Sequence, residues 1–243
     1  MALKNNQKIA FLTAGGIAPC LSASIGALIM EYAKKLPDVE MIGYSHGYKG
    51  LLLGNYISIN EKVKKNANIL FDFGGSPIGN SRVKLTNTDD CVNRGFIKKG
   101  QDPLEVAAQQ LVKDNVSILH TIGGDDTNTM AASLVDILDK KGIELTVVGL
   151  PKTVDNDVYP IFQTLGASTA AEQSSIFFEN ISNENTTSHR QLIIHEVMGR
   201  NCGWLTTASA KVYRKRLELK RFLPDILIAK KKMGHSCYLH SRI

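Results

Sequence analysis

Short apolar segments alternate with amphipathic segments along most of the chain. Five apolar runs predict buried strands, at residues 7–14, 39–45, 116–122, 144–150 and 191–197. Apolar residues that recur at helical spacing predict helices between them, at about 21–32, 102–113, 129–141, 166–181 and 204–213. Strands and helices that alternate at this spacing predict an α/β protein built on a doubly wound, Rossmann-like parallel sheet.

The loops that lead from a strand into a helix are the candidate sites, because such sheets bind ligands beyond the carboxyl ends of their strands. Two of these loops are rich in glycine, TAGGIAP at 13–19 and FGGSPIGNSR at 73–82. Glycines there let backbone N–H groups approach an anion, and Arg82 adds a positive charge. A tight turn and an ordinary surface loop remain the alternatives at this point.

Two further loops carry paired carboxylates. In GGDDTNT, at 123–129, one aspartate suits a helix N-cap and the other a Mg²⁺ ligand, although both could serve the helix alone. In PKTVDND, at 151–157, two-residue alternation would put Asp155 and Asp157 on one side of an extended segment. One could act as a general base while Lys152 meets a phosphate; a plain polar turn is the alternative.

Composition narrows the class of protein. The 243 residues are 43% apolar and 21% charged, which is typical of a globular chain, and the mean hydropathy is −0.09. No apolar stretch approaches the ~20 residues that a membrane span needs, and the N-terminus lacks the pattern of a signal peptide. The four cysteines show no paired spacing, so we expect a reducing, cytoplasmic compartment.

The net charge of +6 is a local feature of one end of the chain. Residues 211–243 hold ten basic and two acidic residues, so residues 1–210 sum to −2. A nucleic-acid-binding protein is expected to carry its basic excess over the body of the domain, interleaved with aromatic residues. We therefore expect neither a nucleic acid nor a membrane as partner.

Three motifs, in their order and spacing, resemble the phosphofructokinase family: GGDDTNT, PKTVDND and EVMGRNCGW at 196–204. The resemblance covers about residues 8–230. It implies transfer of a phosphoryl group to the 1-hydroxyl of fructose 6-phosphate, with Mg²⁺ as cofactor, in a homo-oligomer (a dimer or tetramer) that acts in glycolysis. Catalysis of this kind depends on positioning and charge neutralisation, with one carboxylate to accept the hydroxyl proton.

The family's functional residues carry over onto matching positions of this sequence. The resemblance makes Asp155 the catalytic base, with Asp157 as its neighbour, and Asp125 the Mg²⁺ ligand. Gly15 and Arg82 match positions that contact the phosphoryl donor. The positions that match contacts to fructose 6-phosphate and the transferring phosphoryl group are Thr153, Met198, Gly199 and Arg200.

Two departures from the ATP-dependent pattern point to pyrophosphate as the donor. Members that use ATP usually have GGDG and PGTIDND, whereas Asp126 and Lys152 replace the two glycines here. A side chain and negative charge at Asp126 would obstruct and repel the α-phosphate of a nucleotide, while Lys152 would stabilise a pyrophosphate leaving group. The sequence therefore indicates the pyrophosphate-dependent branch. An ATP-dependent enzyme and an inactive or regulatory paralogue are the alternatives.

The resemblance also sets the expected domain limits. Residues 1–165 form the donor-binding and catalytic domain, and 166–232 an incomplete α/β domain that binds the sugar phosphate. Residues 233–243 follow three lysines abruptly and show neither helical nor strand periodicity. Codons for this tail, read one base later, can encode Trp-Asp-Ile-His-Ala-Ile-Tyr-Ile-Pro-Glu, which is similar to the family's next strand. We expect a frameshifted tail on a C-terminally truncated chain that exposes apolar faces, aggregates and shows little activity.

Overall fold

The computed structural model of the protein describes most of the chain, namely residues 7–184, 192–199, 201–219 and 238–241. The polypeptide forms two compact units, Met1–Thr153 and Val154–Ile243. The division therefore falls ahead of the limit expected at residue 165, directly after the last strand of the first sheet. The functions assigned to the two domains stay predictions.

The first unit is an alternation of strands and helices. Its elements are β1 (Lys8–Thr13), α1 (Leu21–Lys35), β2 (Glu40–Tyr44), α2 (Tyr48–Leu53), β3 (Tyr56–Ser58), α3 (Glu61–Lys65), the 3-10 helix η1 (Ala67–Asp72), α4 (Thr88–Asn93), α5 (Pro103–Lys113), β4 (Val116–Gly123), α6 (Asp125–Asp139) and β5 (Thr146–Pro151). Each of the four strands expected here is present within two residues of its expected limits.

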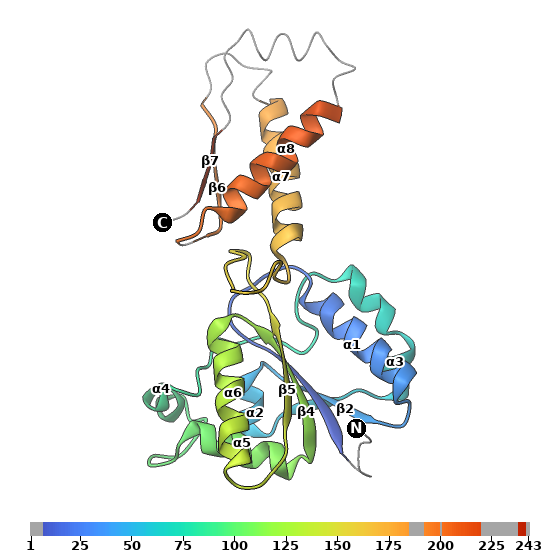
Figure 1. Ribbon diagram of the computed structural model, residues 1–243, viewed down its shortest axis with the longest axis vertical. Helices are drawn as coiled ribbons and strands as arrows, with labels where there is room; N and C mark the ends of the chain where they lie inside the picture. Colours follow the sequence, from blue (N-terminus) through green and yellow to red (C-terminus); the bar gives the residue numbers. More distant parts are fainter. Residues whose placement is uncertain (1–6, 185–191, 200, 220–237, 242–243) are drawn as a thin grey trace. The chain divides into compact units, whose positions relative to one another are not determined.

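The five strands form one sheet in the order β3-β2-β1-β4-β5 (Figure 1). β1 pairs in parallel with β2 and β4, and Ile9 lies opposite both Met41 and Ile118. β5 continues the parallel pairing beside β4, whereas β3 runs antiparallel to β2. The predicted doubly wound parallel sheet is confirmed. The antiparallel edge strand was not predicted, because all three of its residues are exposed and no apolar run marks it.

Helices cover both faces of this sheet, with α1 and α3 on one face and α2, α5 and α6 on the other (Figure 1). Successive residues of β1 point to opposite faces. Ala10 and Leu12 pack into the core beneath α2, α5 and α6. Phe11 stacks on His120 of β4 and approaches Tyr32 of α1. A strand buried on both faces is apolar throughout, which explains the uninterrupted run that predicted it.

Helix limits agree with the sequence where a capping residue marks them. Asp102 caps α5 as predicted, since its carboxylate accepts a hydrogen bond of 3.0 Å from the backbone N–H of Leu104. The helix expected at 129–141 instead begins at Asp125, because the turn after β4 is shorter than the loop that was expected.

The second unit contains α7 (Ala167–Glu184), β6 (Ile194–Val197), α8 (Trp204–Leu219) and β7 (Tyr238–Ser241). The two helices pack against each other through Phe178 and Tyr213, whose ring centroids are 5.0 Å apart. Arg216 of α8 donates a hydrogen bond of 2.7 Å to the carboxylate of Glu179 on α7. Both helices and the strand β6 were predicted, and α8 continues beyond the expected end at residue 213.

The tail contains one short strand. Tyr238–Ser241 pairs in parallel with β6, although the sequence of residues 233–243 shows no strand periodicity. Pairing with a neighbouring strand stabilises a segment that its own periodicity does not reveal. The rest of this tail lies outside the described residues, and the frameshift stays a hypothesis.

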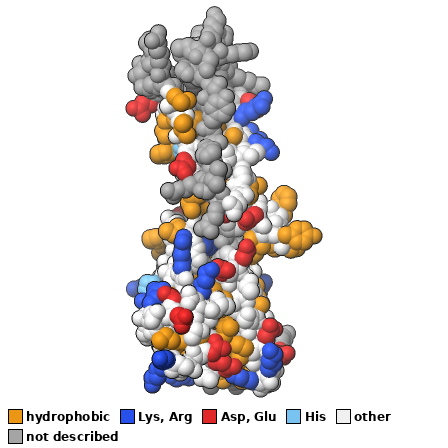
Figure 2. Space-filling view, turned by 90° about the vertical axis from the view of Figure 1, so that its left-hand side faces the viewer, with side chains coloured by type: hydrophobic (Ala, Val, Ile, Leu, Met, Phe, Trp, Pro, Cys, Tyr) orange, Lys and Arg blue, Asp and Glu red, His pale blue; other side chains and the backbone are white. Residues whose placement is uncertain are grey.

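Two surface properties bear on the partners. On the face of the first unit seen in Figure 2, Lys and Arg side chains are intermixed with Asp and Glu side chains rather than gathered by sign. Among the described residues, no helix is long and apolar enough to cross a membrane.

Candidate active site

The two glycine-rich loops are joined to each other by hydrogen bonds. The backbone N–H of Gly15 donates to the carbonyl of Ser81 at 2.9 Å, and the Asn80 amide donates to the carbonyl of Gly15, also at 2.9 Å. The Thr13 hydroxyl, at the end of β1, donates to the carbonyl of Gly79 at 2.7 Å. Gly15 has φ 88°, a left-handed conformation that favours glycine. The loops at 13–19 and 73–82 therefore form one structure.

The carboxyl ends of β1, β4 and β5 converge at Gly15. A methyl group added there would lie 3.5 Å from Thr127 Oγ1, 3.6 Å from the Gly124 nitrogen and 3.7 Å from Lys152 Nζ. Arg82 lies beside the next residue, since a methyl group added at Gly16 would lie 3.7 Å from its Nη2. The structure thus brings Gly15, Arg82 and Lys152 together with the turn after β4, as expected for one anion site.

Lys152 is the buried cation of this site, with a side chain only 2% exposed. Its backbone N–H donates to the carbonyl of Gly123 at 2.9 Å, and its ammonium donates to the carbonyl of Gly16. Burial lowers the pKa of Lys152, and the positive charge of Arg82 lowers this pKa further. Two cations held this close favour the binding of a multiply charged anion.

The turn after β4 is held by Asn128, which the sequence analysis did not identify. Its amide nitrogen donates to the carbonyls of Gly123 at 3.0 Å and Gly124 at 3.2 Å. Its amide oxygen accepts a hydrogen bond of 2.9 Å from the Thr121 hydroxyl. Asn128 lies inside the motif GGDDTNT, but the chemistry of an amide side chain at this position does not by itself indicate a structural role in the site.

Asp125 and Asp126 both lie in the first turn of α6, and both are exposed. The N-cap of the helix is Gly124, so the expectation that one aspartate caps the helix is wrong. The carboxylates instead lie at the positive end of the helix dipole, where negative charge is favoured. Asp126 forms an ion pair of 2.5 Å with Lys84, a second residue that the sequence analysis missed. No apolar or motif pattern had marked Lys84.

The sequence predicts an extended segment after β5, but in the structure this segment is not extended. Asn156 has φ 53°, and its side-chain oxygen accepts hydrogen bonds of 2.7 Å from the Thr164 N–H and 3.0 Å from the Thr164 hydroxyl. Asparagine tolerates this left-handed conformation, which breaks the two-residue alternation. Asp155 is half-buried and Asp157 is exposed. The sulfur of Cys202 donates to the carbonyl of Asp155 at 3.1 Å.

The structure describes all but one of the remaining residues that are expected to contact the sugar phosphate. Thr153 is half-buried at the end of the first unit. Met198 follows β6 and is 60% exposed, and Gly199 has φ 136°. Arg200 lies outside the described residues. Each candidate of the second unit that the structure describes lies after β5 or β6, where the sequence placed it.

Comparison with known proteins identifies relatives of this chain. A protein of Methylotuvimicrobium alcaliphilum named pyrophosphate–fructose 6-phosphate 1-phosphotransferase is 60% identical over 220 residues, 90% of this chain and 54% of that protein. A protein of Clostridium perfringens named ATP-dependent 6-phosphofructokinase 2 is 35% identical over 205 residues, 84% of this chain and 52% of that protein. The chain thus spans about half the length of the curated relatives it matches.

The fold has a counterpart among solved structures. The crystal structure of a pyrophosphate-dependent phosphofructokinase from Nitrosospira multiformis matches with a TM-score of 0.76 at 18% identity, over 97% of this chain and 60% of that one. At this identity the match shows a shared fold. A family model described as phosphofructokinase matches residues 8–214. The chain therefore belongs to the phosphofructokinase family.

Proposed function

We infer that the chain carries the site of a pyrophosphate-dependent phosphotransferase, which forms fructose 1,6-bisphosphate and phosphate from pyrophosphate and fructose 6-phosphate, reversibly. The observation that carries this proposal is the buried ammonium of Lys152 at the point where three loops meet at Gly15. An ammonium aimed at a glycine-lined turn suits a small, compact polyanion. It would neutralise the charge that develops on the departing phosphate.

The donor assignment is supported by Asp126 and Lys152 together. Both side chains occupy positions where members of the family that use ATP usually have glycine. Asp126 adds bulk to the first turn of α6, and its negative charge is paired with Lys84. We therefore place steric obstruction ahead of charge repulsion as the reason for rejecting a nucleotide. The higher identity to the relative named for pyrophosphate supports the same donor.

In the proposed reaction, the carboxylate of Asp155 accepts the proton of the 1-hydroxyl of the sugar. The hydroxyl oxygen then forms a bond to the nearer phosphorus of pyrophosphate, and the bridging P–O bond breaks to release phosphate. Asp157 is the proposed neighbour that supports the base. The residues proposed to hold the sugar phosphate and the transferring group are Thr153, Met198, Gly199 and Arg200.

Mg²⁺ is the proposed cofactor, and Asp125 is its proposed protein ligand. Among the described residues, no group of three or more His, Cys, Asp or Glu side chains could hold a metal. A single exposed carboxylate beside a phosphate site still fits Mg²⁺, which commonly takes one or two carboxylates and completes its shell with phosphate oxygens and water. When bound, the ion would supply charge neutralisation for the donor.

We also propose that the protein is a homo-oligomer and that it is located in the cytoplasm. Large apolar side chains of the second unit are exposed, including Tyr159 at 96% and Phe162 at 93%, which supports association with another copy. The lack of paired cysteine spacing supports the reducing compartment. Sedimentation equilibrium of a version completed to the length of the curated relatives tests the oligomer, and a purely monomeric protein at micromolar concentration would contradict it.

The function is tested by comparing donors in one coupled assay for fructose 1,6-bisphosphate. We expect a version completed to the length of the curated relatives to use pyrophosphate and not ATP, and its variant Asp126→Gly/Lys152→Gly to shift donor use towards ATP. The matched control is Asp139→Gly/Lys140→Gly, because these exposed residues have the same types and lie at the opposite end of α6. Preference of the unchanged chain for ATP would support the ATP-dependent alternative. Binding of pyrophosphate without turnover of either donor would support the inactive paralogue.

A further inference from the structure

An ion pair joins the end of one donor loop to the first turn of α6. The ammonium of Lys84 lies 2.5 Å from a carboxylate oxygen of Asp126, and the two side chains are 52% and 69% exposed. Lys84 is two residues beyond Arg82, which lies beside Gly16 in the donor site. The pair therefore links the loop that supplies the arginine to the turn that supplies the carboxylates.

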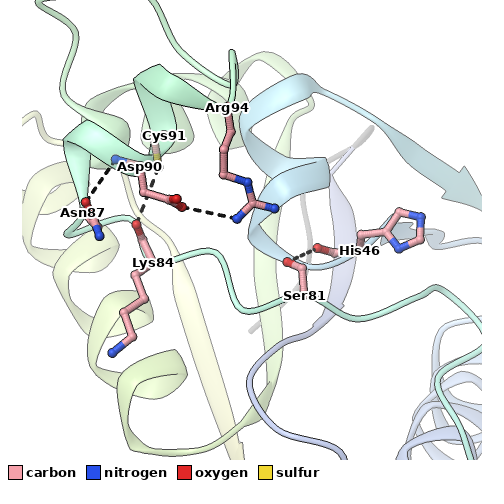
Figure 3. Close-up of polar contacts among 7 residues, drawn as sticks. All are labelled: His46, Ser81, Lys84, Asn87, Asp90, Cys91 and Arg94. Carbon is pink, nitrogen blue, oxygen red and sulfur yellow. Dashed lines mark hydrogen bonds and ion pairs between the residues drawn. The ribbon is translucent and has the colours of Figure 1, made fainter.

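The backbone of Lys84 is held on both sides. Its neighbours Val83 and Leu85 are each only 1% exposed, and the N–H of Leu85 donates to the Met130 sulfur of α6 at 3.0 Å. The thiol of Cys91 donates to the carbonyl of Lys84 at 3.6 Å, and the lysine side chain extends to the side opposite Cys91 (Figure 3). Because the two flanking side chains are buried, the lysine side chain emerges at a fixed place over α6.

The ion pair removes an electrostatic conflict that the proposed donor creates. An unpaired carboxylate at Asp126 would repel pyrophosphate as well as a nucleotide, because both carry several negative charges. The Lys84 ammonium cancels this charge and leaves the bulk of the aspartate side chain in place. Selection against the larger donor can then coexist with tight binding of the smaller one.

We propose that Lys84 is a positioning residue that determines donor specificity: its ammonium fixes and neutralises the Asp126 carboxylate, so that pyrophosphate is accepted where a nucleotide is obstructed. This inference rests on the proposed function. It assigns Lys84 an action through Asp126 rather than direct contact with the donor. The two roles differ in what happens when Asp126 has no charge.

A double-mutant cycle separates these roles. Binding of inorganic pyrophosphate to the full chain is measured by calorimetry at fixed Mg²⁺ for Lys84→Met, Asp126→Asn and the double variant. Lys113→Met, at the exposed end of α5, is the matched control. We expect Lys84→Met to weaken binding by about three- to tenfold, since it leaves an unpaired negative charge near the donor. We expect the double variant to bind as the unchanged chain does, and Lys84→Arg to bind within about twofold of it.

Each other outcome overturns the inference. A double variant that binds pyrophosphate as weakly as Lys84→Met does, so that removing the Asp126 charge restores nothing, would make Lys84 a direct ligand of the donor. No loss from Lys84→Met, or the same loss from Lys113→Met, would leave Lys84 without a specific role. These results leave the proposed function standing as long as the unchanged chain binds pyrophosphate. If the unchanged chain does not bind it, the proposed function fails and the inference fails with it.

Discussion

The ammonium of Lys152 donates a hydrogen bond to the carbonyl oxygen of Gly16, so a side chain from the end of β5 is tied to the loop that follows β1. The side chain is buried, and the cation of Arg82 adds to the cost of its charge. An arrangement of this kind destabilises the empty site and is stabilised when an anion binds. The charge at Lys152 is thus arranged for a ligand rather than for the fold.

Replacing Lys152 with methionine should remove donor binding and leave the fold intact. Methionine fills a similar volume without a charge, so the free energy of unfolding should stay the same or increase. The value of kcat/KM for pyrophosphate should fall about 10²- to 10³-fold, as for loss of one charge-stabilising group. The control is Lys140→Met at the exposed end of α6. An unchanged kcat/KM would remove Lys152 from the site.

The lowered pKa of Lys152 predicts two opposite effects of alkaline pH. Pyrophosphate binding needs the protonated ammonium. As the pH is raised, binding should therefore begin to weaken before the pH reaches 10.5, the ordinary pKa of lysine. Stability should change the other way. Between the folded pKa and 10.5 the unfolded chain binds more protons, so the free energy of unfolding rises with pH. Calorimetry across this range measures the effect on binding, and chemical denaturation with Lys152→Met as reference measures the effect on stability.

The sequence predicted the parallel sheet because the strands β1, β2, β4 and β5 are apolar runs separated by amphipathic helices. It missed β3, whose residues are exposed, and it placed the start of α6 too late. A helix that begins with Asp125-Asp126-Thr127 has no apolar residue in its first turn to reveal it. Apolar periodicity indicates which residues are buried, so it does not reveal exposed strands or polar helix ends.

The sequence predicts the residues of the candidate site that face one ligand from the loops. It does not predict the side chains that hold these loops in place. Gly15, Arg82 and Lys152 were chosen for charge and flexibility, and the structure brings them together. Asn128 and Lys84 act through contacts between segments distant in sequence or through backbone carbonyls. Such contacts have no spacing pattern, because they depend on the tertiary fold.

Replacing Asn128 with alanine should loosen the turn that presents Asp125 and Asp126. The variant loses the hydrogen bonds to two glycine carbonyls and leaves the Thr121 hydroxyl without its acceptor. We expect a loss of about 1–3 kcal/mol in the free energy of unfolding and a higher KM for pyrophosphate. Asn93→Ala, at the exposed end of α4, is the control. Unchanged stability and KM would show that the turn does not depend on this amide.

His120 should make the fold sensitive to acid. The ring is 4% exposed and stacks on Phe11, its Nε2 lies 2.8 Å from the Tyr32 hydroxyl, and among the described residues its Nδ1 has no hydrogen-bond partner. Burial lowers its pKa to about 4 from an ordinary 6.5. Between these values the unfolded chain binds more protons, so stability falls as pH falls.

The measurement for His120 is the free energy of unfolding at several pH values for the unchanged chain and for His120→Phe. The stability of the unchanged chain should fall relative to the variant by about 3 kcal/mol between pH 7 and pH 4. Phenylalanine keeps the stacking on Phe11 and has no proton to bind. Parallel curves for the two proteins would contradict a neutral, buried imidazole.

Asp155→Asn, made in a version completed to the length of the curated relatives, tests the base of the proposed reaction. Asparagine has nearly the same shape as aspartate but cannot accept the hydroxyl proton, so kcat should fall about 10²- to 10⁴-fold. Fructose 6-phosphate binding and the free energy of unfolding should change far less than kcat, because the substitution keeps the shape of the side chain. The control is Asp139→Asn at the exposed end of α6, and Asp157→Asn is compared with Asp155→Asn to test the neighbouring carboxylate. A value of kcat near that of the unchanged chain would reject Asp155 as the base, and an equal loss from both variants would mean that the two carboxylates act as a unit.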